Sequence, residues 1–267
     1  MYITGSAASF EVLDAIRGGD GGAEGASPGT TTATRAGTAG TGIYSTAEDA
    51  TLVLRSPVSS GFSFGLGGGA GTLGTALHAT GSRTTIDLVD TTLTGDTYLS
   101  GALAHLRGAG TITGGLTLSS GSTLAPGHSI GTLTVGTLDI AGTTLDAEID
   151  ANARTADLIE VTGATANITG ATVNISTWAG TPRAGDVYRL LNVPAGVITG
   201  TFTLGTLPPG VSATLVHSPT FVDLRITAFV PPAPTAVPGL GGWSVAALAL
   251  LLAACGLRPN RQPWRRP

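Results

Sequence analysis

The sequence predicts an all-β protein: a right-handed parallel β-helix (solenoid) followed by a single C-terminal transmembrane helix. Three observations lead to this fold class. From Gly42 onward, short runs of about four to six residues alternate apolar and polar side chains, the period of a strand with one buried face. Glycine interrupts these runs, and no long amphipathic helix separates them. The chain then ends in an uncharged apolar stretch from Ile226 to Leu257.

Residues 1–41 are expected to form a low-complexity, loop-rich segment. Runs of Gly and Thr at 18–22 and 30–34 are typical of loops. No basic n-region and no apolar h-region follows Met1, so the sequence predicts no secretion signal there. Because an exported protein needs such a signal, we expect the chain to be a truncated part of a longer protein or to start at a misassigned Met.

Residues 42–229 carry the strand pattern, with Leu, Ile and Val at inward positions and Thr, Asp, Asn and Glu at outward ones. The clearest predicted strands are 50–54, 84–88, 116–118, 133–135, 137–140, 144–149, 166–168 and 172–175. A sandwich, a barrel and a parallel β-helix all fit this alternation. The near-repetition of Gly-Thr-Ile-Thr and Gly-Thr-Leu-Thr at 110–114 and 131–136 favours a solenoid with coils of roughly 20 residues.

The C-terminal part divides into a Pro-rich linker at 230–236 and a tripartite tail at 237–267. A membrane-spanning helix needs about 20 apolar residues. Residues 238–257 supply that length, so we expect them to contact membrane lipid. Four arginines follow the span, and basic residues remain on the cytoplasmic side of a membrane. These are Arg258, Arg261, Arg265 and Arg266. The remainder of the chain would then lie outside the inner membrane.

Composition excludes several classes of function. Charged residues are 11% of the chain, and all 13 basic residues are arginine. Without the four tail arginines, acids outnumber bases, so the sequence predicts no nucleic-acid partner. The single Cys255 allows no internal disulfide and no cysteine metal site. His78, His105, His128 and His217 lack the spacing of metal ligands, so no metal or cofactor site is predicted.

The C-terminal motif reads Val237, Pro238, Gly239, Leu240 and then Trp243. With the apolar stretch and the Arg cluster, it resembles the IPTL-CTERM type of bacterial C-terminal sorting signal. The usual form has Pro-Thr-Leu and an acidic residue before Trp, where this chain has glycine. The resemblance implies that a membrane sorting and processing enzyme recognises the motif and cleaves nearby. An inner-membrane-anchored precursor would then pass to the outer surface or be secreted. A plain tail anchor is the alternative.

Residues 108–163 contain Ser-Thr-Leu-Ala-Pro-Gly-His-Ser-Ile-Gly-Thr-Leu-Thr-Val and, further on, Ala-Asp-Leu-Ile-Glu-Val-Thr-Gly. This pattern resembles the passenger-associated strand repeat of autotransporters, the surface β-helices of Gram-negative bacteria. His128 stands where that family commonly has Asn. The region 185–226 is similar to the C-terminal part of such passengers, which implies a cap on the β-helix. The family's membrane barrel is replaced here by the Pro-rich linker and the sorting tail, which implies delivery by a sorting machine.

From its residues, the centre of this repeat is a structural corner. Pro126 and Gly127 predict a tight turn, because Pro fixes one φ and Gly permits a positive one. Ser129 is expected to bond the local backbone and Ile130 to re-enter the core. Gly131 is expected to allow close stacking of the next coil.

These observations predict an exported cell-envelope protein that is not an enzyme and has a structural or adhesive (adhesin) role, with an unknown surface glycan or protein as ligand. One alternative is a carbohydrate-active β-helix enzyme, which would need two carboxylates about 5–9 Å apart. The candidate acids are Asp87, Asp90 and Asp96, and separately Asp139, Asp146, Glu148 and Asp150. The other alternative is the stalk of a larger, truncated surface protein.

Overall fold

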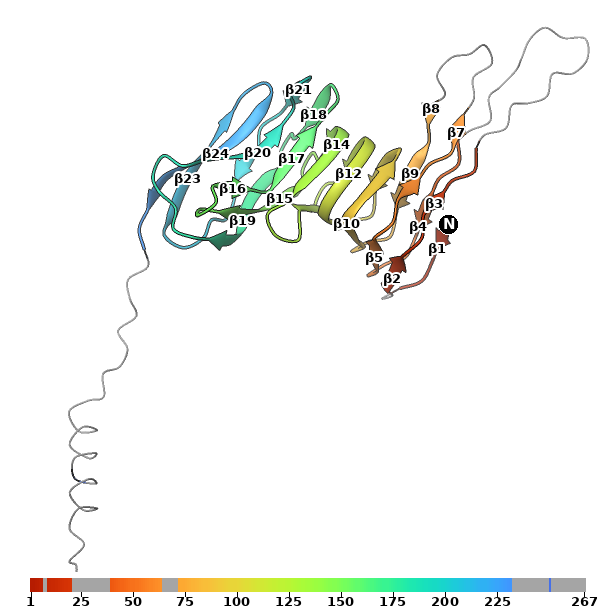
Figure 1. Ribbon diagram of the computed structural model, residues 1–267, viewed down its shortest axis with the longest axis horizontal. Helices are drawn as coiled ribbons and strands as arrows, with labels where there is room; N and C mark the ends of the chain where they lie inside the picture. Colours follow the sequence, from red (N-terminus) through yellow and green to blue (C-terminus); the bar gives the residue numbers. More distant parts are fainter. Residues whose placement is uncertain (7–8, 21–38, 64–71, 232–249, 251–267) are drawn as a thin grey trace, which may run out of the picture. The chain divides into compact units, whose positions relative to one another are not determined.

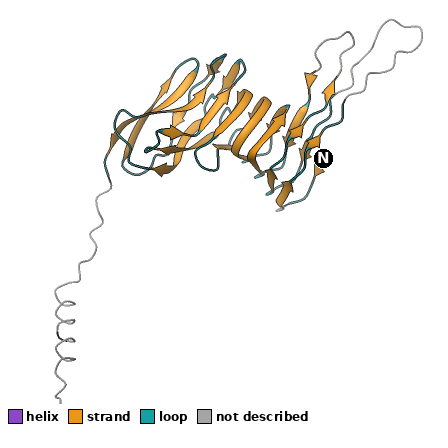
Figure 2. Ribbon diagram, in the orientation of Figure 1, coloured by secondary structure: helices purple, strands orange, loops and turns teal. Residues whose placement is uncertain are grey.

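The computed structural model describes residues 1–6, 9–20, 39–63, 72–231 and 250. The chain divides into two compact units, Met1–Val230 and Pro231–Pro267. In its described residues the first unit consists of strands and connecting loops (Figure 2), so the predicted all-β class is confirmed.

Three stacks of parallel strands, here called stacks A, B and C, build the first unit (Figure 1). Stack A contains β1 (Tyr2–Ile3), β4 (Ile43–Ser45), β9 (Thr75–Ala79), β11 (Asp96–Leu99), the last part of β12 (His105–Leu118), the second half of β14 (Thr132–Asp139), β18 (Thr165–Asn167) and β21 (Val197–Thr199). Stack B contains β2 (Ser9–Val12), β5 (Thr51–Leu54), the first half of β10 (Thr85–Thr94), the first part of β12, β13 (Thr123–Pro126), β15 (Thr144–Asp150), β19 (Thr172–Ala179) and β22 (Thr203–Leu204).

Stack C contains β3 (Ile16–Arg17), β6 (Val58–Ser59), the second half of β10, the middle of β12, the first half of β14, β17 (Leu158–Val161) and β20 (Val187–Asn192). The chain visits A, B and C in turn and then repeats the circuit. Each strand therefore pairs in parallel with its counterpart one coil away, which is a β-helix-like arrangement.

Coil length falls from the first coils to the middle of the unit and then rises again. Tyr2 pairs with Tyr44, 42 residues later, and Thr51 pairs with Thr85, 34 residues later. Hydrogen-bonded side chains on neighbouring coils are 20 residues apart at Asp87 and Arg107. The separation is 28 residues between Asp139 and Asn167, and 32 between Glu160 and Asn192. The later coils carry longer excursions, one of which contains β16 (Thr155–Ala156), antiparallel to β15.

The core is a column of aliphatic side chains stacked coil upon coil. In stack B the inward column consists of Leu52, Ile86, Leu106, Leu124, Leu145 and Val173, all of them buried. The outward neighbours are mostly threonines in register. The predicted alternation of inward aliphatic and outward polar residues is confirmed in strands such as β13 and β15, which bury every second side chain.

A ladder of glycines follows the corner between stacks C and A. Its members are Gly19, Gly40, Gly61, Gly74, Gly95, Gly114, Gly136, Gly163 and Gly196. A Cβ on Gly136 would lie 2.6 Å from the backbone oxygens of Gly114 and Thr113, and one on Gly163 would lie 2.3 Å from the oxygen of Gly136. The coils approach each other here with backbone against backbone, so positions such as Gly136 and Gly163 exclude a side chain.

An antiparallel hairpin covers the last strand of stack C. β24 (Phe221–Phe229) pairs antiparallel with β20 on one side and with β23 (Val211–His217) on the other. This change from parallel to antiparallel pairing ends the repeated circuit.

The prediction of a loop-rich segment over residues 1–41 is wrong for its first part. β1, β2 and β3 form a coil that pairs with β4, β5 and β6. These strands have two to four residues each, which is too short for alternation to show in the sequence. Contact with the next coil stabilises them. A second departure is the antiparallel pair β7 (Phe62–Ser63) and β8 (Thr72–Leu73), which interrupts the coil pattern.

Candidate functional site

The Pro-Gly corner follows β13 and turns the chain from stack B into stack C. Gly127 has φ +96°, and a Cβ there would lie 2.1 Å from the backbone oxygen of Ser129. Only glycine fits this conformation without strain. Pro126 is buried as the last residue of β13.

Ser129, Ile130 and Gly131 lie in other surroundings than the sequence predicted. Ser129 is exposed, and Ile130 is half-buried instead of belonging to the core. Both line a recess of about 380 Å³ together with Glu148 and Asp150. Gly131 approaches Gly127 of its own corner: its Cβ would lie 2.8 Å from the Gly127 Cα. The close contact is thus within one turn, because the corner doubles back on itself.

Asp157 fastens the corner to the following coil. Its side chain is 2% exposed. The Gly131 amide donates to Oδ1 over 2.8 Å, and the Glu148 amide donates to Oδ2 over 2.8 Å. Burial raises the pKa of Asp157 to about 7, against the two backbone hydrogen bonds that lower it. Asp157 is a functional position that the strand pattern did not identify, although an acid directly before the apolar strand residues Leu158 and Ile159 was a usable signal.

A second cluster ties three consecutive coils together and is named here the Asp87 cluster: Asp87, Arg107 and His128. Arg107 donates from Nη2 and Nε to Asp87 Oδ2 over 2.6 and 3.0 Å. His128 Nε2 lies 2.5 Å from Asp87 Oδ1. The Asp87 side chain is 8% exposed, so both oxygens of a nearly buried carboxylate are occupied. The arrangement is an inter-coil clamp, and the sequence could not reveal it because coil register decides which residues meet.

The structure does not bring the first group of candidate acids together. Asp90 is exposed at the register shift within β10, where the strand passes from stack B to stack C, and has φ +47°. Asp96 lies in stack A, where its Oδ1 accepts the Gly115 amide over 2.8 Å. Asp87 lies in stack B. Three carboxylates close in sequence therefore have three separate environments.

In the second group, Asp139 and Asp146 accept side-chain amides from Asn167 and Asn174 on the next coil, over 3.0 and 3.2 Å. Glu148 and Asp150 share the recess of about 380 Å³ beside the corner.

The outward face of stack A carries a ladder of rings: Tyr2, Tyr44, His78 and Tyr98. Tyr2 and Tyr44 are stacked with centroids 5.4 Å apart. His78 meets Tyr44 edge-to-face at 5.3 Å and Tyr98 at 5.8 Å. Ring pairs at these distances attract each other. Because Tyr2 is 65% exposed, the ladder ends in a ring accessible to solvent.

The predicted C-terminal site falls almost wholly outside the described residues. Its members there are Val237, Pro238, Leu240, Trp243, Arg258, Arg261, Arg265 and Arg266. Leu250 alone is described, as helical and 72% exposed. Within the described ranges, the structure contains no helix with the length and apolar character needed to cross a membrane.

Comparison with known proteins bears on this same segment. The family profile called the IPTL-CTERM motif matches residues 235–266. No curated protein matches the chain. The chain therefore carries an IPTL-CTERM motif, a C-terminal sorting signal, after a unit of stacked β coils.

Proposed function

We propose that this chain is an exported cell-envelope protein with a structural or adhesive surface role, delivered through its C-terminal signal. One observation carries the proposal: the IPTL-CTERM match at 235–266 directly follows a folded unit that ends at Val230. A sorting signal attached to a compact body implies that the body is the cargo.

The body has features suited to such a role. Parallel connections between strands of one sheet are right-handed in about 98% of cases, which supports a right-handed β-helix. The resemblance of 108–163 to the passenger-associated repeat points to surface display. The ring ladder of stack A offers aromatic surface for contact with other molecules.

The tail supplies the delivery step. Residues 238–257 span the inner membrane as one helix, and the four terminal arginines hold its end in the cytoplasm. A membrane processing enzyme recognises Val237, Pro238, Leu240 and Trp243 and cleaves nearby.

Intact mass spectrometry of fractionated native cells tests this proposal. We expect a species in the outer membrane or medium that ends before Trp243, and a small precursor pool in the inner membrane. Pro238→Ala is expected to shift the protein to the uncleaved inner-membrane form. Pro231→Ala is the matched control, because it lies outside the matched segment, and should be processed normally. If most of the protein keeps Arg266 and stays in the inner membrane, the tail is a permanent anchor and the delivery proposal is wrong.

The recess holding Glu148 and Asp150 favours one second candidate, a carbohydrate-active enzyme. We nevertheless propose a non-catalytic body, because Asp150 Oδ1 already accepts the Asn152 and Ala153 amides over 2.8 and 3.0 Å. Purified protein is expected to release no reducing ends from acidic or neutral polysaccharides. Release that disappears in Glu148→Gln but persists in Glu160→Gln would establish the enzyme instead.

A further inference from the structure

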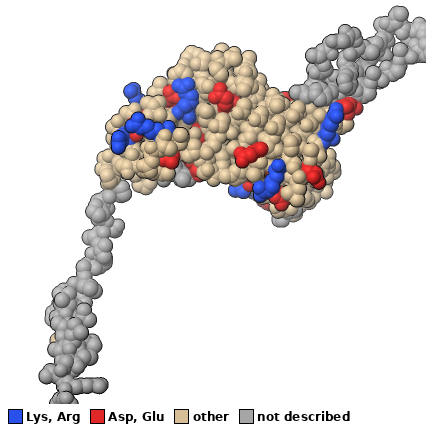
Figure 3. Space-filling model, viewed as in Figure 1, with Lys and Arg blue, Asp and Glu red and all other residues tan. Residues whose placement is uncertain are grey.

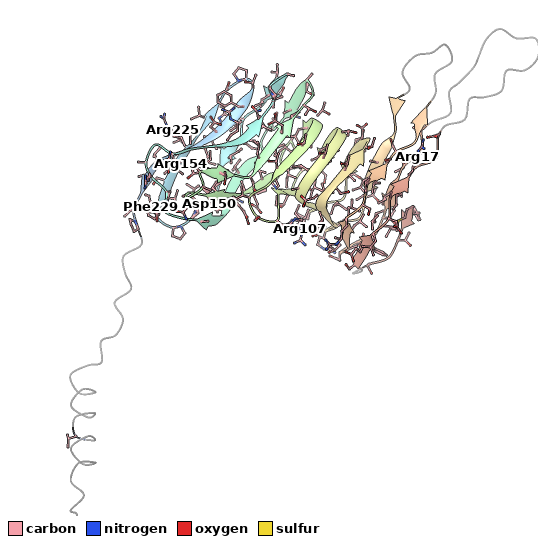
Figure 4. The ribbon with its side chains drawn as sticks, viewed as in Figure 1. Arg17, Arg107, Asp150, Arg154, Arg225 and Phe229 are labelled. Atoms are coloured by element: carbon pink, nitrogen blue, oxygen red, sulfur yellow. The ribbon has the colours of Figure 1, made fainter. Side chains whose placement is uncertain are left out.

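Two excursions from the coil pattern enclose a separate recess near the cap hairpin. One runs from Asp150 to Thr155, between β15 and β16, and Figure 4 labels Asp150 and Arg154 on it. The other is the turn between β19 and β20. The recess has a volume of about 390 Å³, within the range of small-molecule sites. Its lining residues are Ala151, Asn152, Arg154, Thr181, Arg183 and Asp186.

The recess is basic in an otherwise acidic body. Figure 3 shows Arg side chains gathered over the end of the unit that carries β20, β23 and β24. The Arg154 side chain is 65% exposed, and its Nη2 lies 3.8 Å from Asp186 Oδ1. Asp186 Oδ2 accepts the Arg183 amide over 2.9 Å. Among the described residues, the Arg183 guanidinium has no ion-pair partner. The lining therefore carries two guanidiniums and one carboxylate, and the Asp150 carboxylate lies next to it, on the backbone amides of Asn152 and Ala153.

The backbone of the first excursion determines where Arg154 lies. Arg154 has φ +58°, a left-handed conformation that non-glycine residues rarely adopt. Asp150 lies at the start of this excursion, directly before the lining residue Ala151. The charge of Asp150, like those of Asp186 and Arg154, acts on the phenol of Tyr188, whose pKa is raised mainly by burial.

The chemistry of the lining selects a ligand class. Guanidinium groups bind carboxylates through paired N–H donors. Asn152 and Thr181 each offer a donor and an acceptor, and Asp186 accepts only, which suits hydroxyl groups. Asp186 and the neighbouring Asp150 would repel a doubly charged phosphate more strongly than a singly charged carboxylate. We propose that this recess binds one carboxylated sugar unit, a hexuronate. This inference rests on the proposed adhesive role and names its ligand class.

The test uses the full chain, purified in detergent, and isothermal titration with D-glucuronate. We expect saturable binding, with no binding of D-glucose, which lacks the carboxylate. Arg154→Gln and Arg183→Gln are each expected to weaken binding at least tenfold. Arg225→Gln, an exposed arginine outside the recess, is the matched control and should bind as the original chain does. Thermal unfolding of each variant checks that the fold is retained.

Two outcomes overturn the inference: no saturable glucuronate binding by the folded protein, or inorganic phosphate binding at least as tightly as glucuronate. A loss in Arg225→Gln equal to that in Arg183→Gln would also overturn it, since the effect would then be general charge. Cell fractionation of Arg183→Gln separates the two proposals. If the protein is delivered normally but does not bind glucuronate, only the hexuronate proposal is wrong. If the original chain is not delivered to the envelope surface, the proposed function is wrong.

Discussion

Alanine at Gly136 is expected to destabilise the first unit by about 3 kcal/mol or more, beyond the usual range for an overpacked site. The new Cβ would lie 2.6 Å from two backbone oxygens, those of Gly114 and Thr113. Backbone atoms in a paired strand cannot move aside as a flexible side chain can. Relief would require separating two coils and breaking their hydrogen bonds. Chemical denaturation of the purified full chain, followed by far-UV circular dichroism, measures the change.

Gly19→Ala is the matched control for this substitution. Gly19 belongs to the same ladder, yet a Cβ there meets no atom of the described residues within 4 Å. We expect a change of about 0.5 kcal/mol or less, the range typical of surface substitutions. Equal effects of Gly19→Ala and Gly136→Ala would show that glycine at 136 is not required by close approach.

The glycine ladder illustrates which features of this fold the sequence predicts and which it does not. Glycine punctuation between alternating runs correctly indicates corners. The sequence does not indicate that glycines from every coil meet at one corner, because that depends on coil lengths. These lengths fall from 42 residues between the paired Tyr2 and Tyr44 to 20 between Asp87 and Arg107, and rise again to 32 between Glu160 and Asn192. A constant repeat of roughly 20 residues fits only the middle of the unit.

The candidate sites also differ in whether they depend on local sequence or on coil register. The C-terminal signal is local in sequence, so its letters identify it directly. The positive φ of Gly127 follows from a single dipeptide and is likewise local. The Asp87 cluster and the basic recess each combine residues from different coils, so their members become neighbours only through register. The prediction for residues 1–41 fails because coil stacking, rather than strand pattern, orders β1, β2 and β3.

Asp157 is expected to make the protein more stable at pH 4 than at pH 7, by up to about 4 kcal/mol. Its folded pKa of about 7 lies above its ordinary value of 3.8. Between these two values the folded state binds more protons than the unfolded state, so stability rises as the pH falls. The cost of burying the ionised carboxylate is fully present above pH 7 and disappears below about pH 4. Denaturation midpoints across this range measure the slope.

Asp157→Asn is expected to remove that slope and to reverse the ranking of the two proteins with pH. An amide side chain has one acceptor oxygen, so it can serve the Gly131 amide or the Glu148 amide but not both. The orphaned donor costs about 1–3 kcal/mol, which makes the variant less stable than the original chain at pH 4. At pH 7 the original chain carries the larger cost of a buried charge, and the variant should be at least as stable. Asp90→Asn, at an exposed position within β10, should keep the slope of the original chain. If the slope survives in Asp157→Asn, the carboxylate is ionised in the fold throughout this range, and its two backbone hydrogen bonds outweigh its burial.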